Sequence, residues 1–427
     1  MFKALLLVLA LLLIASVGIL FSQHSITSTR TTLRERLQYM EAAAETEIAN
    51  VVVRVADAGA TTQPPRKALQ RRRVTASSTD SSSSSNSAAQ PLASSPPPTE
   101  SPPPPSPPPP LECPGRRPYH VLLTAASGIY QQWQSRIMYW QYKKLKAEFP
   151  CSDLGGFTRL LNTRNSRPDG LMHEIPTIVV GQLGGGRCDE CDHGFIVMNR
   201  PWGLRQLVRH PAFATIKEEY LFIVETDHLL LKPLKNSATD NKPIGFGFYY
   251  MTYKYDPPKL RPVIAKYHDP EKVDAVGPSP VVISKATLAK LVDPWWEMCL
   301  TLKRDRQADA AFGWVLEMWG YALTAARMGI RHTVMQTLQA EPGGVGIPSL
   351  DPYYIYHYTF DLDLQTRTDI FGRGKREHWG WSKRRFMGNY PPRLDPPKQG
   401  VSSSVTRFAQ IMNGAIDAIR PWAAVRE

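Results

Sequence analysis

The 427-residue sequence lacks several features that mark common classes of protein. Only five cysteines are present, which excludes a scaffold held together mainly by disulfides. There is no phosphate-binding loop of the G-x-x-x-x-G-K-[ST] type and no internal repeat. The net charge of +13 would suit a nucleic-acid partner. Because no motif of a nucleic-acid-binding fold accompanies that charge, we expect no nucleic acid to bind.

The sequence is compatible with either disulfides or free thiols at the cysteines. Cys188 and Cys191 form a C-x-x-C pair, but no second pair is present to complete a tetrahedral zinc site. We therefore expect either a local disulfide or two free thiols there. In an oxidising secretory compartment the five cysteines would form disulfides with one thiol left over.

An uncharged apolar run begins directly after Lys3. It covers residues 4–21, ALLLVLALLLIASVGILF, which is near the minimum length for spanning a bilayer and longer than the core of most signal peptides. No small-x-small cleavage site follows, so an uncleaved signal anchor is favoured over a cleaved signal peptide. Basic residues lie on both sides of the apolar run, so their distribution does not set the orientation of the chain in the membrane. A short cytosolic tail, residues 1–3, and a lumenal body are expected.

Residues 22–117 have the composition of a stem. Apolar side chains recur at roughly helical spacing over 32–55, which is compatible with a self-associating helix that forms a homodimer or with an isolated amphipathic helix. Residues 57–110 are rich in Ser, Thr, Ala and Pro, and end in SSPPPTESPPPPSPPPP. Such a segment cannot bury a core, and its prolines favour extended polyproline II. We expect a disordered spacer.

The globular domain is predicted to span residues 118–390, followed by a C-terminal extension over 391–427. Strand-like and helix-like segments alternate in it, which is typical of an α/β domain with a mainly parallel sheet. A long aromatic-rich helix is expected around 133–146, and another over 308–328 with Gly329 as its C-cap. The predicted strands are YHVLLTA, IPTIVV, GFIVM, YLFIVE, IGFGFYY and PSPVVIS.

Two carboxylates, Glu225 and Asp227, follow the apolar strand YLFIV. In an extended chain both side chains would lie on one face, where the strand leaves the sheet and ligands of α/β proteins bind. Paired carboxylates suit a hard divalent ion such as Mn²⁺ or Mg²⁺, which can hold a diphosphate. The alternative is an exposed strand end with solvated charges. His228 would point away from the pair, and we expect it to support the ligands rather than to bind the ion.

Several longer motifs carry a resemblance to a known family. An apolar anchor, a Ser/Pro-rich stem and E-x-D after an apolar strand are together similar to Golgi type II glycosyltransferases of the GT-A fold. Five further motifs follow one another along the chain: QQWQSRIMYWQYKK, VMNRPWG, IKEEYLFIVETDH, AFGWVLEMWGYA and YIYHYTF. In these motifs and their order the chain resembles the peptidyl hydroxyproline O-arabinosyltransferases over most of residues 119–385. The related peptidyl-serine α-galactosyltransferases are the second candidate.

The resemblance implies an enzyme that transfers β-L-arabinofuranose from UDP-β-L-arabinofuranose to the 4-hydroxyl of hydroxyproline in secreted and cell-wall proteins, with retention of configuration. It implies residence in the Golgi membrane as a single-pass type II protein with a lumenal catalytic domain. A competing interpretation from another class is a non-catalytic carbohydrate- or peptide-binding protein of the Golgi. Such a protein would be expected to lose the metal-binding carboxylates, which this sequence keeps.

The resemblance also implies specific roles for residues. Glu225 and Asp227 match the acidic metal motif, and His357 in IYHYT resembles the distant histidine that completes the metal site. Neutral imidazole is a good ligand for Mn²⁺, although a histidine among tyrosines is otherwise more often simply packed. The expected contacts to the UDP-sugar lie at a strand end, in small-residue turns or in a basic segment: Thr124, Gly155, Gly156, Arg159, Ser279, Lys383 and Arg384. Each group also has an ordinary alternative. Thr124 would simply end a strand, the residues in turns would have no ligand, and the basic residues would be solvated at the surface.

Glu317 and Asp309 are the candidate catalytic carboxylates. Glu317 lies on an otherwise apolar helix, where its burial requires a partner, and we expect it to face the acceptor or the donor sugar. Asp309 lies near the start of that helix, where a simple helix-start charge is the alternative. Aromatic residues on the same helix would make an acceptor platform, although such residues are more often core: Trp314, Trp319 and Tyr321.

Overall fold

The computed structural model describes residues 113–183, 195–341, 347–366 and 377–425. The predicted tail, anchor and most of the stem, together with the Cys188–Cys191 pair, lie outside these residues. Within the described ranges no helix is long and apolar enough to cross a membrane.

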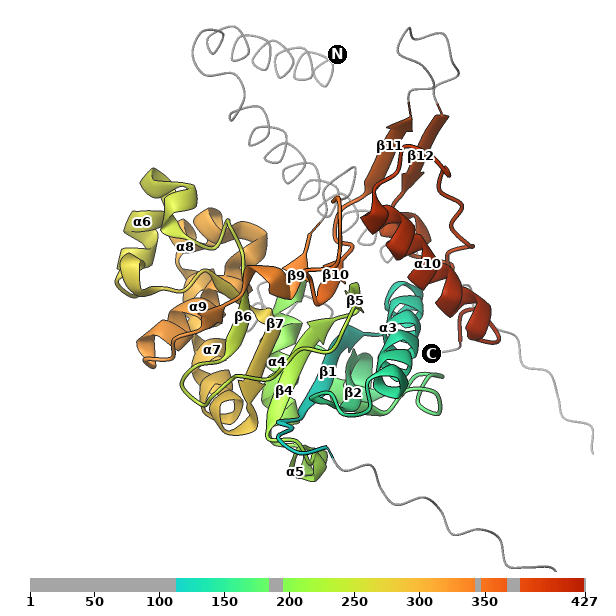
Figure 1. Cartoon of the computed structure of the whole chain (residues 1–427). Helices are drawn as coiled ribbons and strands as arrows, with labels where there is room; N and C mark the ends of the chain where they lie inside the picture. Colours follow the sequence, from blue (N-terminus) through green and yellow to red (C-terminus); the bar gives the residue numbers. More distant parts are fainter. Residues whose placement is uncertain (1–112, 184–194, 342–346, 367–376, 426–427) are drawn as a thin grey trace, which may run out of the picture. The chain divides into compact units, whose positions relative to one another are not determined.

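A seven-stranded mixed sheet, in the order β3-β2-β1-β4-β7-β6-β8, forms the centre of the fold (Figure 1). Its strands are β1 (Tyr119–Ala126), β2 (Leu154–Thr163), β3 (Thr177–Gly181), β4 (Tyr220–Glu225), β6 (Ile244–Gly247), β7 (Val276–Ser284) and β8 (Thr333–Val334). Strands β1 to β4 run parallel to one another, as β6 does to β8, whereas β7 is antiparallel to its neighbours β4 and β6. The predicted α/β domain with a mainly parallel sheet is confirmed.

Helices cover both faces of this sheet. They are α3 (Ile129–Glu148), α4 (Asn199–Leu207), α5 (Pro211–Thr215), α6 (Pro257–Ala265), α7 (Lys285–Arg304), α8 (Arg306–Phe312) and α9 (Leu316–Arg327). Alternate residues of β4 enter different cores, because successive side chains of a strand point to opposite faces. Phe222 shares a core with Met138 of α3, whereas Leu221 shares one with Leu204 of α4 and Leu291 of α7. Both faces of β4 are therefore buried, as its continuous apolar sequence indicates.

A smaller three-stranded sheet lies at the carboxyl end of β4. Its strands β5 (His228–Leu230), β10 (Ile355–His357) and β9 (Gln339–Ala340) are ordered β5-β10-β9. A hairpin of β11 (Leu362–Thr366) and β12 (Glu377–Trp381) follows.

The segment predicted as a C-terminal extension, 391–427, contains α10 (Ser403–Ala418), which packs against α3. Phe408 of α10 and Trp133 of α3 share a third core with Trp381 of β12. The last part of the chain is thus held beside the helix that follows β1.

Some local predictions differ from the structure. The described part of GFIVM forms a short 3₁₀ helix, Ile196–Met198, rather than a strand. The helix expected over 308–328 is divided into α8 and α9 at Gly313, whose φ of 50° lies in a region that favours glycine. The prediction of Gly329 as a C-cap is confirmed, since it follows α9 with a φ of 71°.

The cysteines differ in state. Cys113 and Cys151 form a disulfide that ties the start of the described chain to the loop before β2. Cys299 is a buried free thiol on α7. The expectation that disulfides form is confirmed for one pair.

Candidate active site

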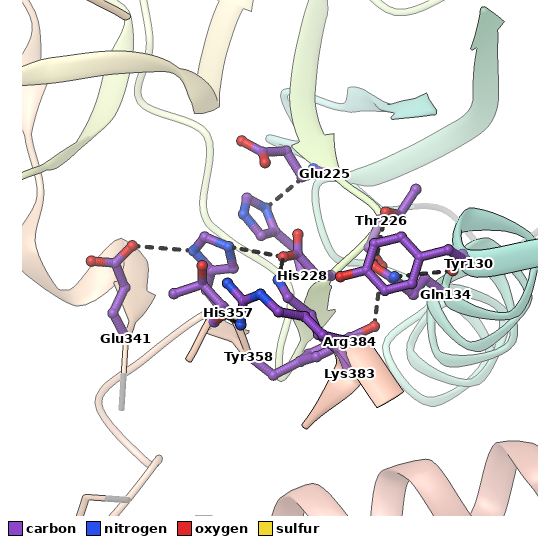
Figure 2. Close-up of polar contacts among 12 residues, drawn as sticks. Tyr130, Gln134, Glu225, Thr226, His228, Glu341, His357, Tyr358, Lys383 and Arg384 are labelled. Carbon is purple, nitrogen blue, oxygen red and sulfur yellow. Dashed lines mark hydrogen bonds and ion pairs between the residues drawn. The ribbon is translucent and has the colours of Figure 1, made fainter. Parts of the chain in front are cut away.

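The acidic motif is a turn rather than a continuous strand. β4 ends at Glu225, residues 226–227 form the turn, and β5 begins at His228. The two carboxylates therefore do not share one face of an extended strand, and that prediction is wrong. The turn nevertheless gathers potential ligand atoms of Glu225, Asp227, His228 and His357, which all lie within 4.8 Å of one another (Figure 2). The prediction that His228 points away is also wrong.

Side chains from distant segments hold this turn in place. The hydroxyl of Thr226 donates to Gln134 of α3 at 3.0 Å, and the hydroxyl of Tyr358 donates to the Thr226 carbonyl at 3.3 Å (Figure 2). The backbone N–H of Tyr358 also donates to the carbonyl of Asp227 at 3.3 Å. The turn is thus fixed by the helix after β1 and by the segment that follows β10.

His357 enters the cluster because β10 pairs antiparallel with β5 and places it opposite His228. Its Nε2 lies 3.3 Å from Asp227 Oδ2, and its Nδ1 lies 3.1 Å from Glu341 Oε1. Although burial lowers it, these two carboxylates raise the pKa of His357 to about 10. The predicted proximity of His357 to the acidic motif is observed, and Glu341 joins it as a residue that the sequence did not suggest.

Lys383 approaches the same carboxylate from a short 3₁₀ helix, Lys383–Phe386. Its ammonium group forms a buried ion pair with Asp227 Oδ2. Burial opposes ionisation of Asp227, but Lys383 and His357 hold its pKa well below the usual range. Arg384 instead donates to the carbonyl of Thr359 and to Asp361, each at 3.3 Å. The basic segment therefore reaches the cluster through Lys383, which is not a solvated surface residue.

These residue types fit a divalent cation. Without a bound cation, the raised pKa keeps the His357 ring protonated, so that Nδ1–H donates to Glu341 and Nε2–H donates to Asp227 Oδ2. If a metal ion took the place of the Nε2 proton, the lone pair of Nε2 and the carboxylate oxygens of Asp227 and Glu225 would be its ligand atoms. Carboxylate oxygens together with one imidazole nitrogen suit Mn²⁺, and less well Mg²⁺.

Glu341 occupies the position of a residue that orients a metal-binding histidine. Hydrogen bonds of this kind fix the histidine tautomer and the ring orientation. We predict that Glu341→Ala weakens Mn²⁺ binding by about tenfold to a hundredfold, whereas Glu341→Gln keeps an oxygen acceptor and most of the affinity. Isothermal titration of Mn²⁺ into the two variants measures this. Equal Mn²⁺ affinity in the alanine variant and the wild type would exclude the orienting role.

Arg200, on the first turn of α4, joins two carboxylates in the site. Its Nη2 lies 3.0 Å from Glu225 Oε1, and its Nη1 lies 3.1 Å from each oxygen of Glu317. Glu317 is fully buried, so the expectation that it needs a partner is confirmed. With both oxygens directed at Arg200, however, Glu317 does not face a substrate. It acts through Arg200 on Glu225.

The charge of Glu317 is predicted to depend on pH near neutrality. Burial raises its pKa to about 7, with Glu225 adding to the effect and Arg200 opposing it. A raised pKa means that the folded protein holds a proton that the unfolded chain releases between its ordinary pKa of 4.5 and about 7. This contribution to stability is complete below 4.5 and is lost as pH rises through 7.

Comparison with Glu317→Gln measures that contribution. From pH 4.5 to 7 the unfolding free energy of the wild type should fall relative to the variant by about 3 kcal/mol. Urea unfolding at a series of pH values provides the two curves. Parallel curves would mean that Glu317 stays ionised throughout this range.

Three residues that were predicted to contact the nucleotide-sugar donor lie away from this cluster. Gly155 and Gly156 are at the start of β2, the opposite end of the sheet from Glu225, because β1, β2 and β4 are parallel. Added Cβ atoms there would meet the Tyr119 carbonyl at 2.6 Å and the His120 ring at 2.6 Å. Close approach is thus required, as the glycine pair suggested, but to the protein's own chain. Arg159 is buried in a bidentate pair with Asp169 and is not available to a phosphate.

Two other predicted contacts remain near the site. Thr124 lies two residues before the end of β1, opposite Glu225, and its hydroxyl donates to the Val224 carbonyl at 3.1 Å. Ser279 lies within β7 rather than in a turn, with its buried hydroxyl 3.5 Å from the Ile223 carbonyl. The turn predicted at GPSP is therefore wrong, and Thr124 is near the strand end rather than at it. Contacts of Thr124 and Ser279 with the nucleotide-sugar donor stay predictions.

The remaining candidates on α8 and α9 have structural roles. Asp309 forms an ion pair with Lys303 at 2.6 Å, and its side chain is 42% exposed. It is therefore an ordinary helix-start charge. Among the described residues, no contact joins it to Glu225. Trp319 stacks on Phe312, and Tyr321 contacts His332; both are buried in the core and cannot form a platform. Trp314 alone of the three aromatic residues is exposed.

The residues that sequence reasoning missed carried weak signals. Arg200 stands beside a proline at the start of a helix, where a basic residue is usually solvated. Glu341 precedes Pro-Gly-Gly and reads as loop. A separation of 117 residues between Arg200 and Glu317 leaves no periodic pattern to detect.

Comparisons with known proteins agree on one family. The model of the hydroxyproline O-arabinosyltransferase family N-terminal domain matches residues 119–334, and that of the C-terminal domain matches residues 354–423. The chain is 40% identical over 314 residues to hydroxyproline O-arabinosyltransferase 3 of Arabidopsis thaliana, covering 71% of this chain and 82% of that relative. It is 37% identical over 315 residues to hydroxyproline O-arabinosyltransferase RDN2 of Medicago truncatula, covering 72% and 82%.

A more distant similarity concerns the second candidate family. Peptidyl serine alpha-galactosyltransferase of Arabidopsis thaliana is 23% identical over 265 residues, which cover 57% of this chain but only 30% of that relative.

Proposed function

Because the chain belongs to the hydroxyproline O-arabinosyltransferase family, we propose that it is a glycosyltransferase that transfers arabinose to hydroxyproline. The observation that carries the proposal is the cluster of Glu225, Asp227 and His357 at the carboxyl end of β4. This edge of an α/β sheet is where ligands bind. The donor is UDP-β-L-arabinofuranose, the acceptor is the 4-hydroxyl of hydroxyproline in proteins or peptides, and the domain is of the GT-A type.

The cluster is proposed to bind Mn²⁺, or Mg²⁺, through Glu225, Asp227 and His357. When bound, such an ion stabilises the negative charge that develops on the leaving diphosphate. Arg200 and Glu341 hold Glu225 and His357 in position for it. Lys383 supplies a further positive charge beside Asp227, where it would also contact the diphosphate. Arg384 and Thr124 lie on nearby segments and are proposed to contact the donor.

Transfer is proposed to retain the anomeric configuration, because the donor and the product share it. An attack of the acceptor from the same face as the leaving phosphate, or a covalent intermediate, would each give that result. Glu317 is not proposed as the nucleophile, because it is fully buried and both of its oxygens are directed at Arg200.

Golgi residence as a single-pass type II membrane protein is part of the proposal. It is supported by the apolar run of residues 4–21 and by the proline-rich stem. The Cys113–Cys151 disulfide also suits a lumenal catalytic domain, since disulfides are characteristic of oxidising compartments. A homodimer through the helix predicted over 32–55 is proposed on helical spacing alone.

Two other functions are less well supported. A serine galactosyltransferase would share the general plan, but that relative matches at much lower identity and over a small part of its length. A non-catalytic Golgi protein would have no need of a partly buried cluster of two carboxylates and two imidazoles.

A panel of donors and acceptors tests the proposal. The purified protein is incubated with Mn²⁺, with each of several UDP-sugars, and with paired peptides that differ only in hydroxyproline or serine. A pentose should be added only from UDP-β-L-arabinofuranose and only to the hydroxyproline peptide. Addition of a hexose to the serine peptide would favour the galactosyltransferase, and no transfer would favour a binding protein.

A further inference from the structure

His228 has one ring nitrogen engaged and one that is not. It is fully buried, and its Nδ1 accepts the backbone N–H of Glu225 at 3.3 Å (Figure 2). Its Nε2 is buried and has no hydrogen-bond partner among the described residues. The ring packs edge-to-face against His357, with centroids 4.5 Å apart. A polar atom buried in this way within the candidate site calls for a partner.

The engaged nitrogen determines which tautomer is present. A backbone N–H can only donate, so Nδ1 must present its lone pair to Glu225. Neutral imidazole carries one hydrogen, which is therefore on Nε2. An imidazolium would carry a hydrogen on both nitrogens and could not accept at Nδ1, so the ring that accepts from Glu225 is neutral. His228 thus offers an N–H donor within the candidate site.

We propose that the Nε2–H of His228 donates a hydrogen bond to a phosphate oxygen of the nucleotide-sugar diphosphate, and that His228 is not a metal ligand. The inference rests on the proposed function and extends it to this residue. Glu225, Asp227 and His357 present oxygen or nitrogen lone pairs, which suit a cation. An N–H in the same cluster repels a cation but suits an anionic oxygen that a cation holds nearby.

The competing role is that of a fourth metal ligand. Ligation through Nε2 would need its lone pair, which moves the hydrogen to Nδ1. Nδ1–H would then face the N–H of Glu225, so that two donors would oppose each other where the structure has a hydrogen bond. A purely structural role, through the contact with the His357 ring, is the other alternative.

One substitution separates these roles. In His228→Asn the amide oxygen lies near the position of Nδ1 and can still accept from Glu225, but no donor extends to the position of Nε2. Mn²⁺ affinity without nucleotide is measured by electron paramagnetic resonance, and UDP affinity at saturating Mn²⁺ is measured by calorimetry. We expect unchanged Mn²⁺ affinity and UDP binding weaker by about tenfold to a hundredfold, as for a lost hydrogen bond to a charged group.

His332→Asn is the matched control, because His332 is also buried and its ring contacts Tyr321 instead of the cluster. It should leave both affinities unchanged. Loss of Mn²⁺ affinity in His228→Asn alone would make His228 a metal ligand, and unchanged UDP affinity would leave it a structural role. Either result overturns the inference while the proposed function stands. A wild-type protein that binds no UDP would overturn both.

The tautomer is measured independently in the wild type, so the test does not depend on a variant that folds. Nitrogen-15 resonances of labelled histidine distinguish protonated from unprotonated ring nitrogens, with Mg²⁺ as the diamagnetic ion. We expect Nε2 of His228 to be protonated and its resonance to shift when UDP is added. A protonated Nδ1, or an Nε2 signal that does not respond to UDP, would contradict the inference.

Discussion

Replacing Asp227 with alanine is expected to lower the rate of sugar transfer by on the order of a thousandfold, because a metal ion supplies several kcal/mol of charge stabilisation to a reaction of this kind. Asp227 contacts both His357 and Lys383, so its loss also disturbs a second proposed metal ligand and the buried lysine beside it. Initial rates of arabinose transfer at saturating UDP-arabinofuranose and Mn²⁺ measure the effect.

The same variant is also expected to be less stable. From the sequence alone, removing one of two neighbouring carboxylates should leave stability near or above that of the wild type. The structure reverses this expectation, because Asp227→Ala leaves Lys383 buried without its charged partner and leaves His357 with Glu341 alone. Breaking a buried ion pair costs about 3–5 kcal/mol.

Asp293→Asn is the matched control for activity. Asp293 also forms ion pairs with basic residues, but at the surface and outside the cluster. It should transfer arabinose at the wild-type rate. Full activity of Asp227→Ala, or of the wild type in excess EDTA, would contradict the assignment of the metal site.

Replacing Arg200 with alanine is expected to reduce the unfolding free energy by about 3–5 kcal/mol. The change leaves Glu317 fully buried with no cation and removes the group that holds Glu225. The positive charge of Arg200 is itself stabilised there: burial opposes it, but Glu225 and Glu317 raise the pKa of Arg200 above its usual value. Urea unfolding of the purified protein measures the difference.

Arg205→Ala on the same helix provides the comparison. Arg205 pairs with Asp293 at 2.7 Å, but both side chains are partly exposed, and such surface pairs contribute at most about 1 kcal/mol. Adding Glu317→Leu to Arg200→Ala should recover part of the loss, because the unpaired buried carboxylate is then gone. Similar losses of unfolding free energy in the two arginine variants would mean that the group of Arg200, Glu225 and Glu317 stabilises the fold no more than a surface ion pair does.

The sequence predicted the elements with strong local patterns. β1, β4 and α3 follow from long apolar or periodic runs, and the acidic motif was found because charges interrupt such a run. β2 was missed because Gly155 and Gly156 open it, and glycine weakens the strand signal although here it allows close packing against Tyr119 and His120.

The site itself depends on contacts that local patterns do not encode. Asp227 meets His357 across 130 residues and Lys383 across 156 residues. The family resemblance pointed to His357 and the basic charge of its segment pointed to Lys383, whereas Arg200 and Glu341 emerged only from the structure. The turn at residues 226–227 also reversed the orientation expected for His228, because strand alternation no longer applies once the chain turns.

The central claim is that one divalent cation binds between the acidic turn and β10 and serves transfer to hydroxyproline. Crystals of the protein grown with Mn²⁺ and UDP allow the ion to be located by anomalous scattering at the manganese edge. The account predicts a single strong peak in contact with Glu225, Asp227 and His357, with the UDP diphosphate on its open side. A UDP-bound structure with no manganese at these residues, or with the ion elsewhere, would contradict it.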